Sequence, residues 1–105
     1  FRNLGVCWFF YFDGVSDPYV GNRLLILCTL RPRGAPWEYH LSTEDAAKIV
    51  SEAKPEMAII THFGMKMIFR DPAIEAEYIE RQTGVRAIAA VDGMRIRIGR
   101  ELQIK

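Results

Sequence analysis

The side chains of this sequence best suited to chemistry at neutral pH are its two histidines, His40 and His62. An imidazole titrates within the physiological pH range and can move a proton, and its neutral form is a good zinc ligand. His40 closes a loop just before a helix cap expected at Ser42, and His62 follows a strand expected over 57–61. Ligands of open α/β sheets bind beyond the carboxyl ends of strands. Both histidines therefore stand where a site is expected, and the alternative is that each caps or packs locally.

Two arginines flank Pro32 in the loop that leads to His40. Near a site, Arg31 and Arg33 could hold a phosphate through bidentate hydrogen bonds, and the alternative is that both are solvated. The hydroxyl of Ser42 is not expected to be a nucleophile, because its role as a helix cap already explains it.

Two helices are expected to position these groups. The first begins at Ser42, whose hydroxyl can accept the amide of Asp45, and it stops at Pro55. The second begins at Asp71-Pro72, a cap followed by proline at the first helical position, and it ends at Gly84.

Apolar runs bounded by turn residues predict the strands. The last two are expected to pair as a hairpin through the two-residue turn Asp92-Gly93. The predicted strands are Val6–Phe12, Leu24–Leu30, Met57–Thr61, Val85–Val91 and Met94–Ile98. The order β-β-α-β-α-β-β predicts a layered α/β fold with helices packed on a sheet.

Length and composition limit the classes of protein. The chain has 105 residues, so residues 1–105 are expected to form a single domain, which could be part of a larger one. A net charge of +1 gives no support to an electrostatic nucleic-acid binder. Two cysteines make no disulfide framework, which favours the cytoplasm, and no apolar run is long enough to span a membrane. Phe1 is not an initiator methionine, which leaves open a fragment or a processed product.

The segments HLSTEDA (40–46) and AIITHFG (58–64) together resemble the C-terminal half of a metallo-β-lactamase-fold hydrolase. The nearest branch contains metal-dependent phosphodiesterases and tRNA-processing enzymes. The resemblance covers roughly residues 5 to 99 and includes the apolar strand 24–30 and the terminal hairpin. It implies a partial αββα sandwich, in which this chain supplies about one sheet and its helices.

The resemblance also implies a chemistry. His62 matches the late histidine that binds one metal of a two-metal site, and His40 matches a histidine that orients substrate or protonates a leaving group. Zinc or another divalent metal is the expected cofactor, since two such ions can clamp both oxygens of a phosphoryl displacement.

The sequence departs from the family pattern in its metal ligands. It contains no His-x-His-x-Asp-His string, and Trp8 stands where the family has a bridging aspartate. Asp13 or Asp17 could replace that aspartate only if the loop were rearranged. A catalytic zinc normally takes three protein ligands, so the chain alone is expected to be inactive.

Two hypotheses about function follow. In the first, the chain is part of a metal-dependent hydrolase that acts on phosphodiesters. In the second, it is a non-catalytic half-domain that acts as a structural or oligomeric interaction module. A half-sandwich would expose one apolar sheet face, which predicts a homo-oligomer, most simply a two-fold dimer. Neither a membrane nor a nucleic acid is an expected partner, except for nucleic acid as a substrate of the intact enzyme. The apolar stretch 65–69 is expected to be core, a lid or a partner surface.

Overall fold

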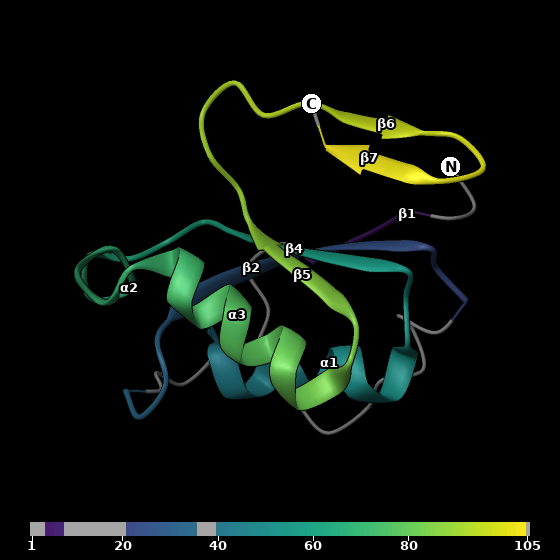
Figure 1. Ribbon diagram of the computed structural model, residues 1–105. Coiled ribbons are helices and arrows are strands. Elements are labelled where there is room, and N and C mark those ends of the chain that lie inside the picture. The colour runs from purple at the N-terminus through teal and green to yellow at the C-terminus, as the bar shows by residue number, and fades with distance from the viewer. Residues whose placement is uncertain (1–3, 8–20, 36–39, 105) are drawn as a thin grey trace.

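A twisted parallel sheet forms the centre of the computed structural model, which describes residues 4–7, 21–35 and 40–104 (Figure 1). The strands of this sheet run in the order β1-β2-β4-β5, and β3 pairs with the far end of β2. All of the pairings in this sheet are parallel. The strands are β1 (Leu4–Cys7), β2 (Leu24–Arg31), β3 (Leu41–Ser42), β4 (Met57–Thr61) and β5 (Arg86–Ala89).

Three helices connect these strands. The crossover from β2 to β4 contains α1 (Thr43–Ala53), and the crossover from β4 to β5 contains α2 (Met65–Arg70) and α3 (Pro72–Thr83). Parallel neighbours need such crossover connections. Figure 1 shows α1 and α3 side by side under one face of the sheet.

The predicted helix caps are confirmed. The Ser42 hydroxyl accepts the amide of Asp45 at 3.3 Å, and the Asp45 carboxylate accepts the Ser42 amide at 3.0 Å. Asp71 caps α3 by accepting the amide of Ala73, and Gly84 ends that helix with φ +75°. Side-chain acceptors at the first turn satisfy amides that the helix itself leaves unpaired.

The two faces of the sheet have separate cores, because successive side chains of a strand point to opposite sides. On β4, Ala58 and Ile60 pack against the helices, while Met57 and Ile59 pack on the opposite face. The runs of consecutive buried residues in β2 and β4 thus reflect cover on both faces, as the continuous apolar pattern predicts.

A short antiparallel ribbon covers the face opposite the helices. It consists of β6 (Ile96–Ile98) and β7 (Leu102–Ile104), and Figure 1 shows it on the far side of the sheet from α1 and α3. Leu102 is buried against residues of β2 and β4, and the Arg23 guanidinium donates to the Arg100 carbonyl in the ribbon's turn at 2.8 Å. The expectation of a wholly exposed sheet face is therefore wrong for this part of the face.

The predicted hairpin is also wrong. Asp92-Gly93 does form a turn, with Gly93 at φ +83°, but β5 before it pairs in parallel with β4 and not with β6. The hairpin lies one step later, between β6 and β7. The α/β class is confirmed, whereas the element order gains β3, α2 and β7.

The described residues include no helix that is long and apolar enough to cross a membrane.

Candidate functional site

The carboxyl ends of β2, β4 and β5 meet at one edge of the sheet, and the segment after β4 is fixed there by backbone contacts. The Gly64 amide donates to the Leu30 carbonyl at 3.1 Å, and the Ala90 amide donates to the Ile60 carbonyl at 2.9 Å. Gly64 approaches β2 so closely that a Cβ at this position would lie 3.1 Å from the Leu30 carbonyl oxygen. The backbone that carries His62 is therefore held between β2 and β5.

His62 lies directly after β4 and has a left-handed backbone conformation, with φ +60°. Such a conformation costs a residue with a Cβ roughly 1–2 kcal/mol. Strained residues of this kind cluster at functional sites, where the surrounding structure holds them in place. The side chain of His62 is exposed at this edge.

The strand register brings His40 and His62 to within one residue of the same level of the sheet, on opposite sides of β2. Leu41 pairs with Thr29 on one side of β2, and Thr61 pairs with Cys28 on the other side. His40 and His62 are neighbours of Leu41 and Thr61, and adjacent strands lie about 4.8 Å apart, so their backbones are about 10 Å apart across β2. His40 is half-buried.

A third segment ends at this level. Cys7, the last residue of β1, pairs with Leu27 on the same edge of β2 that β3 uses further along. The positions suggested for a bridging carboxylate, Asp13 and Asp17, and Trp8, follow β1 in the sequence and lie outside the described residues.

The two candidate phosphate-binding arginines are engaged within the protein. The buried Arg31 donates from Nε to the Ala35 carbonyl at 2.7 Å. Arg33 donates from Nε to the Glu75 carboxylate at 2.9 Å, and its guanidinium lies 4.4 Å from the centre of the Tyr78 ring. A role in phosphate binding stays a prediction for both.

The buried carboxylate of Glu75 is the polar residue of this region that sequence reasoning missed. Its side chain is fully buried on α3, yet it accepts hydrogen bonds from Arg33 and Thr43. A glutamate in the first turn of a helix is ordinary, since the helix N-terminus favours negative charge. The partners lie 42 and 32 residues away in the sequence, so no local sequence pattern predicts them.

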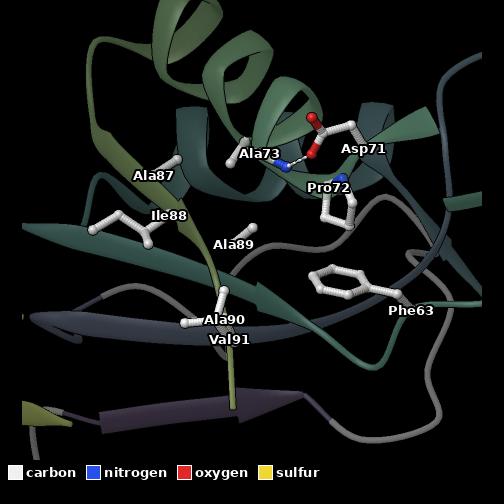
Figure 2. A pocket seen from close by; sticks show the side chains of 10 residues that line it. Phe63, Asp71, Pro72, Ala73, Ala87, Ile88, Ala89, Ala90 and Val91 are labelled. Carbon is white, nitrogen blue, oxygen red and sulfur yellow. Dashed lines mark hydrogen bonds between the residues drawn. The ribbon is translucent and has the colours of Figure 1, made fainter. Parts of the chain in front are cut away.

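A largely apolar pocket of about 420 Å³ opens between α3 and the end of β5, and Phe63, the residue after His62, is part of its lining. In Figure 2 the ring of Phe63 points toward Pro72 and Ala89 across this pocket, and Asp71 lies at its rim with its carboxylate bonded to the Ala73 amide. Small side chains on both walls leave the space open. The pocket offers room for an apolar group beside Phe63.

The described residues do not fit a complete metal centre. Within 21–35 and 40–104, no three histidine, cysteine, aspartate or glutamate side chains come together as a metal site. A catalytic zinc normally needs three protein ligands. His62 can contribute at most one of them, so any metal held here requires donors from outside these residues.

Comparison with known proteins supports the architecture. No protein-family model matches the chain. The chain is 36% identical over 84 residues to the uncharacterized protein MJ1374 of Methanocaldococcus jannaschii, and the alignment covers 78% of this chain. The chain spans only 31% of the length of that relative.

A solved structure gives the fold. The metallo-β-lactamase fold protein YhfI from Bacillus subtilis is similar with a TM-score of 0.75 and 14% sequence identity. The similarity covers 97% of this chain and 39% of YhfI. The chain therefore has the α/β architecture of part of a metallo-β-lactamase-like fold.

Proposed function

We propose that this chain is the C-terminal portion of a metal-dependent hydrolase that acts on phosphodiesters, as the resemblance in 40–46 and 58–64 implies. His62 serves as one ligand of a divalent metal, zinc being the first candidate, and the remaining ligands lie outside the described residues. On its own, this chain is inactive.

One observation carries the proposal. Two histidines far apart in the sequence flank β2 within one residue of the same level, and one of them has a strained backbone at the carboxyl end of a strand. This supports a ligand-binding role for the edge of the sheet. The similarity to a metallo-β-lactamase fold protein supports the fold that the proposal assumes.

His40 has a separate role in this proposal. The residue is half-buried and its backbone lies across β2 from that of His62, so in this proposal it acts on the substrate and not on the metal. There it orients the substrate or donates a proton to the leaving oxygen, which is the ordinary work of a histidine general acid.

A second candidate function is a non-catalytic module that persists as an interaction domain. The lack of three clustered ligands within the described residues favours it. So do exposed apolar side chains on α2, where Phe69 is 81% and Met65 is 67% exposed. We keep a homodimer and a cytoplasmic location as proposals under either function.

The test uses the longest open reading frame that contains this sequence. Its product is assayed for hydrolysis of bis(p-nitrophenyl) phosphate, with and without a chelator, next to His62→Ala and His40→Ala variants. We expect turnover that the chelator abolishes, and a loss of about 10²-fold or more in each variant. Turnover that survives both substitutions, or no turnover by the parent, would overturn the proposal.

A second experiment tests whether the 105-residue chain itself binds metal through His62. Thermal unfolding is followed with and without zinc for the parent and for His62→Ala. The module function predicts no effect of zinc on the Tm of either protein. A zinc-induced rise that disappears in His62→Ala would favour the metal-binding function instead.

A further inference from the structure

The carboxyl group of Glu75 lies inside the protein, where burying a charge is costly. Its side chain is 0% exposed on α3, and an unpaired buried carboxylate would be strongly destabilising. The site accommodates it with three donors: the Arg33 amide at 2.7 Å, the Arg33 Nε at 2.9 Å and the Thr43 hydroxyl at 3.0 Å. An apolar side chain would fill the same space without this network.

The donors come from the two ends of the connection between β2 and α1. Arg33 follows β2, and Thr43 opens α1, so Glu75 joins the exit of the strand to the start of the next helix. A single oxygen, Oε1, accepts both the Arg33 amide and the Thr43 hydroxyl. A second carboxylate makes a similar tie, because Glu44 Oε2 of α1 accepts the Gly34 amide at 3.0 Å.

Further contacts hold the Arg33 end in place. Its guanidinium stacks over Tyr78, which lies one helical turn beyond Glu75 on α3. The Arg70 guanidinium donates to the Arg33 carbonyl at 3.3 Å. Both α2 and α3 therefore fix the position of this backbone.

At the other end, Thr43 lies three residues after His40. The intervening Leu41 and Ser42 pair with β2, so the backbone from His40 to Thr43 is short and nearly inextensible. We therefore expect a displacement of Thr43 to move His40 as well.

We infer that Glu75 is a positioning residue, which sets the location of His40 by binding Arg33 and Thr43 with one buried carboxylate. This ordering is independent of any metal. The importance of this ordering for catalysis rests on the proposed function, whereas the ordering itself does not.

The test is made by nuclear magnetic resonance on the 105-residue chain. Glu75→Gln keeps the shape but leaves one acceptor oxygen, and Thr43→Val removes a donor while keeping the volume. We expect exchange of the Arg33 amide proton to rise about tenfold in Glu75→Gln, with a shift or broadening of the His40 ring resonances and none for His62. Thr43→Val should change the His40 resonances in the same direction.

Two controls make the result specific. Thr43→Ser keeps the hydroxyl and should restore the parent His40 spectrum. Glu77→Gln changes an exposed glutamate of the same helix and should leave both histidines unchanged. If Glu75→Gln does not fold, the comparison of Thr43→Val with Thr43→Ser still decides. Parent-like His40 resonances in Thr43→Val would overturn the inference.

In the longer protein, the same pair separates this inference from the proposed function. A loss of turnover in Thr43→Val that Thr43→Ser restores supports both. A change in the His40 spectrum without any change in turnover supports the positioning role and contradicts a catalytic role for His40.

Discussion

The two faces of the central sheet are covered in different ways. On one face, α1 and α3 are built into the crossovers between strands, and they bury Ile60 completely. On the other face, only the ribbon β6–β7 is described as cover, and it is attached after the last strand of the sheet. Two of the residues in this core, Ile26 on β2 and Ile88 on β5, are only partly buried.

This difference predicts which part of the fold unfolds most easily. A helix inside a crossover is tied at both ends to paired strands, so it cannot move far from the sheet. A two-stranded ribbon is marginal by itself and depends on the few apolar contacts beneath it. The helix face should therefore behave as the rigid core, and the ribbon face as the adaptable one.

The largest effect is expected from truncating neighbouring isoleucines of β4. Ile60→Ala should lower the free energy of unfolding by about 4 kcal/mol, because the helices cannot close the cavity. Ile59→Ala, on the ribbon face, should cost about 2 to 3 kcal/mol, because the ribbon can settle inward. Urea denaturation of both variants checks the order, and equal losses would contradict the difference between the faces.

Leu102→Ala should cost about 2 kcal/mol, since it removes the buried anchor of the ribbon. Loosening the ribbon also uncovers the apolar residues beneath it, so self-association at micromolar concentration should increase. Sedimentation velocity measures this, with Ile98→Ala at an exposed ribbon position as the control. A variant that associates no more than the parent would contradict a role of this face in dimer formation.

Local signals predicted much of the framework. Ser42, Asp71 and Gly84 marked helix ends correctly, because capping depends on residues within one turn. The hairpin at Asp92-Gly93 was wrong, because the turn is local whereas the partner of β5 is β4, which lies beyond two helices. A turn-forming dipeptide shows where the chain bends and not which strands then pair.

The candidate site was predicted only in part. The histidines stood out by their residue type and by their positions next to Ser42 and Thr61. Their similar level across β2 follows from strand register, which is set by contacts far apart in the sequence. Glu75 was missed for the same reason, because its partners come from another layer of the fold.

The edge that carries His62 should respond like the rigid face. Gly64→Ala places a Cβ 3.1 Å from the Leu30 carbonyl oxygen, and β2 can yield little. We expect a loss of about 1 kcal/mol in stability, together with a shift of the His62 ring resonances. Chemical denaturation and the histidine spectrum report these two effects, and a neutral substitution would show that this edge adapts.

The smallest effect is expected to be a gain. His62→Gly should raise stability by about 0.5 to 1 kcal/mol, because glycine adopts φ +60° without strain. Lys54→Gly is the matched control, at another left-handed position with no proposed chemistry, and should give a similar gain. A loss of stability in His62→Gly alone would show that the imidazole is held for structural reasons.

β1 and β3 lie one after the other along the same edge of β2, and this arrangement determines how freely the loop before β3 can change in length. Each short strand pairs with β2 in its own register, and the hydrogen bond from Thr43 to Glu75 holds the end of β3 as well, so the length of the loop before His40 does not set the position of β3. Lengthening the connection between Ala35 and His40 by several residues costs little closure entropy, since that cost grows only with the logarithm of loop length. Insertions at this point would change the surroundings of His40 while leaving both cores intact.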